Sequence, residues 1–151
     1  MFHCYLDDFT TGSIFETEGK TLSEAEILDF AFKYDPQPFH MDVEAAKEGP
    51  FGGLIASGLH TMAIGLRLIL QAQIFAPGAS LGSPGIDEIR WLKPVLPGDT
   101  LRVRGETLKV TPSRSKPDRG IVKIRTAIFN QHGEEVMSML SMQIVKRRAA
   151  D

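Results

Sequence analysis

The sequence predicts an α+β fold in which one long helix packs on an antiparallel sheet of about five strands. Three observations lead to this expectation. The first third of the chain carries helix signals, residues 59–75 form its longest apolar segment, and the pattern changes to strands from residue 84 onward. A sheet with one apolar face must bury that face, and the apolar helix is the element that can cover it.

Length and composition are those of one globular domain, which we expect to span residues 1–151. A chain of 151 residues can bury a core without disulfides. The hydrophobic fraction of 42%, the charged fraction of 24% and a mean hydropathy of -0.08 fit an ordinary globular protein. A net charge of -2 gives no electrostatic reason to bind nucleic acid or an anionic membrane. We interpret the basic run Lys146, Arg147, Arg148 as a solvated tail.

The cysteine content and the N-terminal sequence favour a cytoplasmic location. Cys4 is the single cysteine, which excludes an internal disulfide and fits a reducing compartment. We expect it to be a small buried thiol. No stretch reaches the roughly 18 apolar residues of a membrane span, and acids at Asp7 and Asp8 stand where a signal peptide would be basic.

The first predicted helices precede residue 50. Ser23 and Glu26 have the spacing of a capping box, and an apolar stripe at helical spacing follows them. Pro36 should end this helix. Asp42 can cap a second, shorter helix, which we expect to stop at Gly49.

The long apolar segment, Leu59 to Phe75, predicts a buried central helix. Apolar residues recur there at spacings of three and four, and Leu68 and Ile69 fill the other side. A helix that is apolar on most of its circumference is typically buried.

Strand patterns follow and predict an antiparallel meander. The segments are bounded by PGD at 97–99, by a loop at 113–120 and by a turn at 131–134. An earlier strand around Ser13 to Lys20 can join the sheet. The four expected strands are residues 85–93, 100–111, 119–130 and 135–147.

The sequence DPQPFH at 35–40 places an acid and an imidazole five positions apart, around two prolines. We expect the prolines to keep both residues out of a helix. A straight loop would separate Asp35 and His40 by roughly 15 Å, so joint action requires a bend. The two could then form a general acid and base pair on one water. A structural role is also compatible, in which Asp35 caps the loop and His40 packs under Phe39.

A second candidate is IASGLHT at 55–61, where the long helix begins. Gly58 allows close approach, and the free N–H groups of a helix start can hold an oxyanion. Ser57 is expected to be the N-cap and not a nucleophile, since the GxSxG elbow is lacking. His60 should be neutral and form a pocket wall. No histidine spacing fits a metal site, so we expect no metal.

Four blocks of the sequence, in order, resemble the MaoC-like dehydratases, which include the (R)-specific enoyl-CoA hydratases. The blocks are DPQPFHMD at 35–42, AAKEGPFGGLIASGLHT at 45–61, IRWLKPVLPGDTL at 89–101 and NQHGEEV at 130–136. The resemblance implies a hot dog fold, a bent antiparallel sheet wrapped around one long helix. It also implies a homodimer or higher homo-oligomer with active sites between protomers.

The family's hydratase motif falls on Asp35 and His40, with Pro38 at its proline. Gln37 stands where asparagine is frequent, so the hydrogen bond within the loop, or a substrate contact, should differ. The glycine whose N–H faces the thioester oxygen matches Gly58. A serine of some (R)-hydratases falls on Leu66, a departure that bears on the substrate.

The resemblance implies that Asp35 and His40 add water to a 2-enoyl-CoA, or catalyse the reverse dehydration, while Gly58 stabilises the carbonyl oxygen. Coenzyme A would enter only as part of the substrate, with no further cofactor. Candidate cations for its phosphates are Arg90, Lys93 and Arg114. The residues expected to contact the substrate are Gln37, Phe39, Ser57, Leu59, His60 and Trp91.

Two alternative functions stay open for this sequence. The same fold hydrolyses acyl-CoA in thioesterases, and a hot dog domain can bind acyl-CoA without catalysis. An intact pair of Asp35 and His40 argues against the non-catalytic domain, and the thioesterase stays open. The sequence does not indicate the acyl chain, the direction of the reaction or the pathway.

Overall fold

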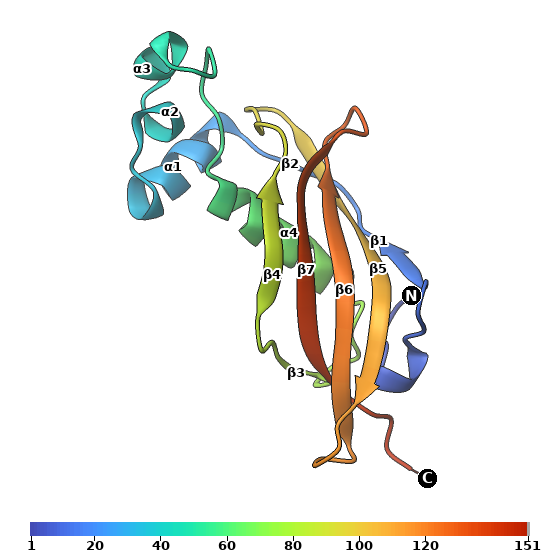
Figure 1. Cartoon of the computed structure of the whole chain (residues 1–151). Coiled ribbons are helices and arrows are strands. Elements are labelled where there is room, and N and C mark those ends of the chain that lie inside the picture. The colour runs from blue at the N-terminus through green and yellow to red at the C-terminus, as the bar shows by residue number, and fades with distance from the viewer. Residues whose placement is uncertain (151) are drawn as a thin grey trace.

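The computed structural model describes residues 1–150, and a seven-stranded sheet is its main element within that range. The strand order is β1-β5-β6-β7-β3, with β2 also paired to β5 and β4 to β7. Figure 1 shows α4 crossing one face of the sheet and the short helices α1, α2 and α3 grouped beyond one end. The predicted fold class, an antiparallel sheet with one long helix in the hot dog arrangement, is confirmed.

The bounds of the elements are as follows. The strands are β1 (Ile14–Glu16), β2 (Lys20–Thr21), β3 (Ser80–Gly82), β4 (Ile86–Trp91), β5 (Thr100–Pro112), β6 (Arg119–Phe129) and β7 (Glu135–Lys146). The helices are the 3-10 turn η1 (Leu6–Asp8), α1 (Glu24–Tyr34), α2 (Pro38–Met41), α3 (Val43–Glu48) and α4 (Gly58–Gln71).

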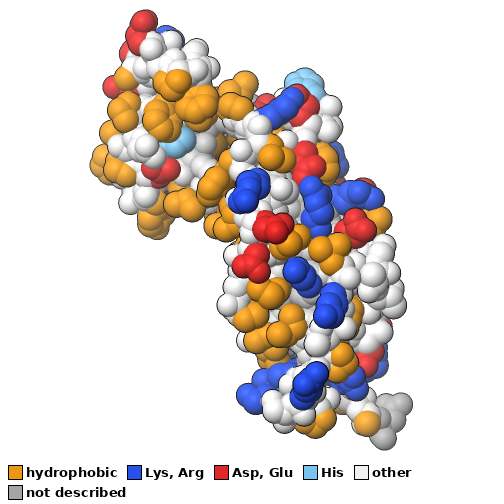
Figure 2. All heavy atoms as spheres, viewed as in Figure 1, with side chains coloured by type: hydrophobic (Ala, Val, Ile, Leu, Met, Phe, Trp, Pro, Cys, Tyr) orange, Lys and Arg blue, Asp and Glu red, His pale blue; other side chains and the backbone are white. Residues whose placement is uncertain are grey.

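Strands β5, β6 and β7 form two long hairpins, as predicted. Their pairing is antiparallel throughout, with Val103 opposite Ile128 and Ile128 opposite Met137. Buried and exposed residues alternate along β5, so Leu101 and Val103 face α4. On the outer face, Lys and Arg side chains are interspersed with Asp and Glu (Figure 2).

The predicted meander is wrong for β4, which pairs with the far side of β7 and not with β5. The segment PGD at 97–99 is a tight turn in a crossing connection. Gly98 adopts a φ of 87°, which favours glycine, and Asp99 accepts a bond from the Leu96 N–H. This bond and the Gly98 turn redirect the chain into β5 without forming a hairpin.

Helix signals before residue 50 are confirmed, with one correction. Ser23 and Glu26 form the capping box of α1, and Asp42 caps α3 through the Ala45 N–H. His40, however, lies in the short helix α2, which the prolines were expected to prevent. Pro38 occupies the first helical position, where its missing N–H costs nothing and its fixed φ suits the helix.

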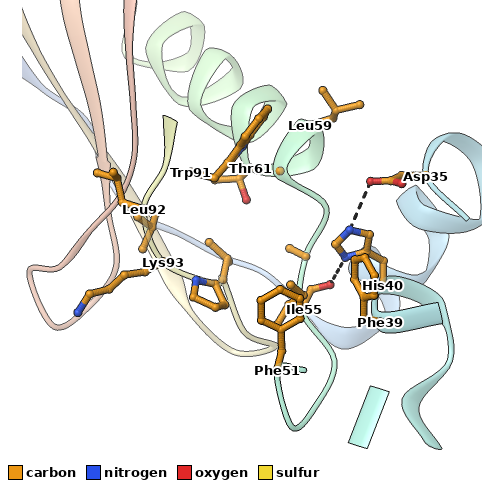
Figure 3. Close-up of a pocket in the computed structure, with 15 residues that line it drawn as sticks. Asp35, Phe39, His40, Phe51, Ile55, Leu59, Thr61, Trp91, Leu92 and Lys93 are labelled. Atoms are coloured by element: carbon orange, nitrogen blue, oxygen red, sulfur yellow. Dashed lines mark hydrogen bonds and ion pairs between the residues drawn. The ribbon is translucent and has the colours of Figure 1, made fainter. Parts of the chain in front are cut away.

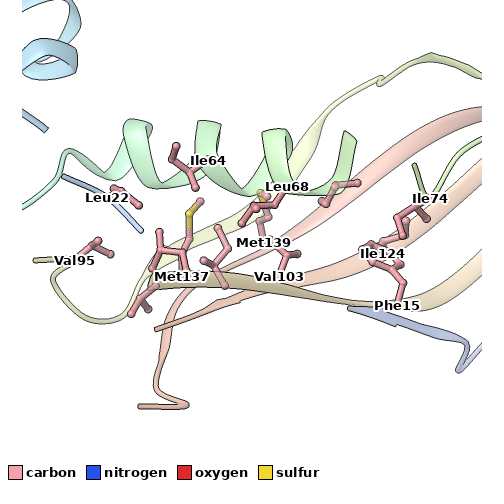
Figure 4. Packing of buried hydrophobic residues seen from close by; sticks show 14 of the residues in the cluster. Phe15, Leu22, Ile64, Leu68, Ile74, Val95, Val103, Ile124, Met137 and Met139 are labelled. Carbon is pink, nitrogen blue, oxygen red and sulfur yellow. The ribbon is translucent and has the colours of Figure 1, made fainter. Parts of the chain in front are cut away.

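Helix α4 packs on the sheet through one face only. Ile64 and Leu68 meet Val103 and Met137 in the core (Figure 4), and Gly65 sits close to Ile128. The expectation of burial on most of the circumference is wrong within this single chain. The opposite side is exposed, and the helix ends four residues before Phe75.

Arg148, which follows β7, lies against the N-terminal turn η1 through bonds to Asp7 and Asp8. Cys4 is buried, as expected, and its backbone forms an isolated β-bridge with that of Phe75. The basic run is solvent-exposed, as expected, with Lys146 at the end of β7. The Arg148 guanidinium also pairs with Asp8 at 2.7 Å and lies over the Tyr5 ring. Within residues 1–150, no helix is long and apolar enough to cross a bilayer.

Gly105→Ala tests the packing of β1 on β5. A Cβ at Gly105 would overlap the ring of Phe15, which is buried and paired directly opposite. We expect a loss of roughly 1–3 kcal/mol in the free energy of unfolding, measured by urea denaturation. Gly53→Ala, where nothing lies within 4 Å of the new Cβ, should change it by less than about 0.5 kcal/mol. Equal urea midpoints for the two variants would contradict this packing.

Candidate active site

A cavity of about 450 Å³ lies between α2, the start of α4 and the end of β4. Its walls are mostly apolar. Polar side chains reach it from Asp35, His40, Thr61 and Lys93, besides the indole of Trp91. Figure 3 shows Asp35 and His40 together on one side of it. A mostly apolar cavity with a few convergent polar groups is typical of a small-molecule site.

The segment 35–40 is sharply bent, which brings its acid and its imidazole together. Gln37 N–H donates to the Asp35 carbonyl at 2.7 Å, and His40 N–H donates to the Gln37 carbonyl at 2.9 Å. The first bond closes the bend, and the second belongs to the first turn of α2. His40 Nε2 and Asp35 Oδ2 are therefore 3.4 Å apart, as the joint-action hypothesis required.

The orientation of His40 is fixed from the opposite side of its ring. Its Nδ1–H donates to the Ile55 carbonyl at 2.8 Å, because a carbonyl can only accept. In the neutral imidazole this bond leaves Nε2 without a proton. Nε2 and the carboxylate of Asp35 are then two acceptors facing one another.

The carboxyl group of Asp35 is held by two donors. Ser57 Oγ–H donates to Oδ2 at 2.7 Å, and Gln37 Nε2–H donates to Oδ1 at 2.6 Å. The Ser57 bond, opposed by partial burial and aided by the Gln37 bond, lowers the pKa of Asp35 below its ordinary value. Asp35 is consequently a carboxylate at neutral pH.

The start of α4 leaves backbone donors at the cavity. Gly58 lines it, and the N–H groups of a first helical turn have no partner within their own helix. The predicted capping bond of Ser57 is wrong, because its side chain makes no bond to the helix and donates to Asp35 instead. The partial positive charge of this helix end is therefore available to a ligand.

The cavity contains some of the residues expected to contact substrate and not others. Phe39, Leu59 and Trp91 line it. Gln37 and Ser57 do not, since both are turned toward Asp35.

The expectation that His60 forms a pocket wall is wrong. Its ring stacks on Phe30 at 4.6 Å, on the side of α4 away from the cavity. Burial lowers the pKa of His60, which agrees with the expectation that its imidazole is neutral. Stacking on Phe30 was missed because helical spacing does not show which neighbour a residue will meet.

Sequence reasoning also missed Ile55, Thr61 and Phe51. Ile55 matters through its backbone carbonyl, which no residue type signals. Thr61 and Phe51 line the cavity, yet each reads in the sequence as an ordinary helix or loop residue.

Of the three candidate cations, Lys93 lies on the cavity and pairs with Glu134. Arg90 donates to the carbonyl of its neighbour Ile89. Arg114 is in the loop between β5 and β6, at the opposite end of the sheet from α2 (Figure 1). Across residues 1–150, no group of three His, Cys, Asp or Glu side chains is placed to hold a metal ion.

Comparison with known proteins places these features in one family. Residues 8–127 match the family described as MaoC like domain. A MaoC-like dehydratase from Rhodospirillum rubrum is 39% identical with a TM-score of 0.91, over 97% of this chain and 99% of that one. Uncharacterized protein YdeM of Bacillus subtilis (strain 168) is 33% identical over 142 residues, 94% of this chain and 99% of its own length.

A third similar protein is the R-hydratase PhaJ1 from Pseudomonas aeruginosa in its unliganded form. It is 25% identical, with a TM-score of 0.76 over 97% of this chain and 92% of that one.

Gly58→Ala tests how the helix start meets β4. A Cβ at Gly58 would overlap the indole of Trp91, so we expect the ring to move into solvent and stability to fall by roughly 1–3 kcal/mol. Trp91 is the single tryptophan, so its emission spectrum should shift to longer wavelength. Gly53→Ala is the control, and an unchanged spectrum in Gly58→Ala would show that the two do not touch.

Proposed function

The chain belongs to the MaoC-like dehydratase family, and from that membership we propose that it adds water to a 2-enoyl-CoA thioester or catalyses the reverse dehydration of a 3-hydroxyacyl-CoA. The observation that carries the proposal is the 3.4 Å approach of His40 Nε2 to Asp35 Oδ2. With a neutral imidazole both atoms are acceptors, and one molecule that donates two hydrogen bonds would satisfy them. Water is the smallest such molecule, and it is also the reactant.

In the hydration direction, the oxygen of this water forms a bond to the β-carbon of the enoyl thioester. One proton of the water passes to the pair of Asp35 and His40, and this pair delivers a proton to the α-carbon. Dehydration reverses these steps. The reaction is redox-neutral, and we propose that coenzyme A enters only as part of the substrate.

Negative charge develops on the thioester oxygen during this addition. The Gly58 N–H, at the positive end of α4, is the donor that we propose stabilises it. Such a bond is stronger in the transition state than in the substrate, and that difference accelerates the reaction. The apolar surfaces of Phe39, Leu59 and Trp91 would hold the flat enoyl group and exclude bulk water.

We further propose that two copies of the chain pair through α4 and β4. Leu59, Leu66 and Leu70 are 47%, 55% and 58% exposed, which is unusual for a helix so apolar. A groove of about 480 Å³ runs between this side of α4 and strands β3, β4 and β7. β4 is also an edge strand among the described residues, with pairing only to β7.

Asp35→Asn and His40→Gln should each lower hydration of an enoyl-CoA by about 10²- to 10⁴-fold, because an amide at either position cannot take up or deliver a proton. Loss of the conjugated thioester absorbance measures the rate, over a panel of chain lengths and branching. Asp29→Asn, an exposed acid on α1 paired with Lys33, is the matched control and should keep full activity.

Full turnover by either site variant would contradict the mechanism. Thiol release from saturated acyl-CoA, with no absorbance change on enoyl-CoA, would identify a thioesterase instead. Binding without turnover across the panel would identify a non-catalytic acyl-CoA domain.

Leu66→Glu should split the proposed dimer, because it places a charge in the apolar interface. Sedimentation velocity at micromolar concentration should give a dimer for the natural chain and a monomer for this variant. Phe32→Glu, at a more exposed apolar residue on α1, should remain dimeric. A monomer for the natural chain, or a dimer for Leu66→Glu, would contradict this interface.

A further inference from the structure

Ser57 occupies the N-cap position of α4, but its side chain makes no hydrogen bond to the first turn of the helix. Its hydroxyl donates to Asp35 Oδ2 at 2.7 Å, and no side-chain bond caps the first turn. An N-cap serine that satisfies the helix typically contributes about 1 kcal/mol. The fold gives up that contribution and places a completely buried donor on the carboxylate.

The two donors on Asp35 differ in how firmly they are held. Gln37 is exposed and reaches Oδ1 through a long side chain. Ser57 has one short side chain, and its backbone is fixed because its carbonyl accepts from the Thr61 N–H at 3.0 Å. The rigid donor therefore acts on Oδ2, which is the oxygen that faces His40.

We propose that Ser57 is a positioning residue for the proposed hydration, and that its hydroxyl fixes the rotation of the Asp35 carboxylate so that Oδ2 and His40 Nε2 face the same water. This inference rests on the proposed function. Without the Ser57 bond, the carboxylate is held by an exposed amide alone and can turn about its last torsion. The water would then lose one of its two acceptors for part of the time.

The same bond sets the protonation of Asp35. Ser57 is the leading cause of the lowered pKa of that carboxyl, so its removal should raise the pKa. His40 is the titratable group facing Asp35. Lys93, across the cavity, is paired with Glu134, and His60, on α4, faces Phe30.

Water is held only while the carboxylate is ionised and Nε2 of His40 is unprotonated, so acid removes activity through either group. Raising the pKa of Asp35 moves the loss of its carboxylate to higher pH. The part of the acid limb of kcat/KM that reports Asp35 should therefore shift upward when the Ser57 hydroxyl is removed.

Ser57→Ala should lower kcat by about 10- to 100-fold, the size expected for a lost hydrogen bond to a charged group. KM should change by less than about threefold, because Ser57 does not line the cavity. Thr107→Val is the control for losing a buried hydroxyl. Thr107 is completely buried, accepts from Ser13 and lies on β5 away from the cavity, so its removal should leave the acid limb in place.

A matched pair covers the case in which Ser57→Ala folds poorly. Ser57→Thr and Ser57→Val have side chains of almost the same shape, but only threonine keeps the hydroxyl. Threonine should retain the acid limb of the natural chain, and valine should show the shifted limb and the low kcat. Equal kcat values together with equal pH profiles for the two variants would overturn the inference.

The inference and the proposed function fail in different ways. If Asp35→Asn loses activity while Ser57→Val matches Ser57→Thr in rate and pH profile, the inference fails and the hydratase proposal stands. If Asp35→Asn is fully active, the hydratase proposal fails. Carbon-13 NMR titration of the Asp35 carboxyl needs no activity. Its pKa should rise in Ser57→Val relative to Ser57→Thr, and equal values would overturn the inference.

Discussion

The contact between segment 35–40 and Ile55 is the constraint on which the site depends. Ile55 N–H donates to the Phe39 carbonyl at 3.0 Å, and the Ile55 carbonyl accepts from His40 Nδ1–H at 2.8 Å. The first bond ties α2 to the chain that leads into α4. The second fixes the tautomer and rotation of the imidazole in a buried position, where an unpaired ring nitrogen would be costly.

Helix α4 links this constraint to the core. Its buried face holds Ile64 and Leu68 against the sheet, so the position of Gly58 relative to β4 is set by core packing. Ala56 N–H donates to the Val95 carbonyl at 2.8 Å and fixes the preceding chain to the segment after β4. The carboxylate, the imidazole and the helix start are thus held by one rigid frame, which is what a preorganised site requires.

Local signals in the sequence predicted much of this fold, whereas contacts between distant segments were beyond it. The Ser23 capping box and the hairpins of β5 to β7 follow from spacing within a few residues. The place of β4 depends on which strand edge is free. The bond from Ser57 to Asp35 depends on where two segments meet. Spacing indicated that the loop must bend for Asp35 and His40 to act together. The Ile55 carbonyl that orients His40 is a backbone group, and no residue type in the sequence indicates its role.

Neutron diffraction from a crystal exchanged into D₂O near neutral pD tests the central claim most directly, because it locates the hydrogens on His40. We predict deuterium on Nδ1 directed at the Ile55 carbonyl and none on Nε2. One water should direct its two deuterons to Nε2 and to Asp35 Oδ2. Deuterium on Nε2 pointing straight at Asp35, with no water between them, would show a direct ion pair and contradict the proposed water site.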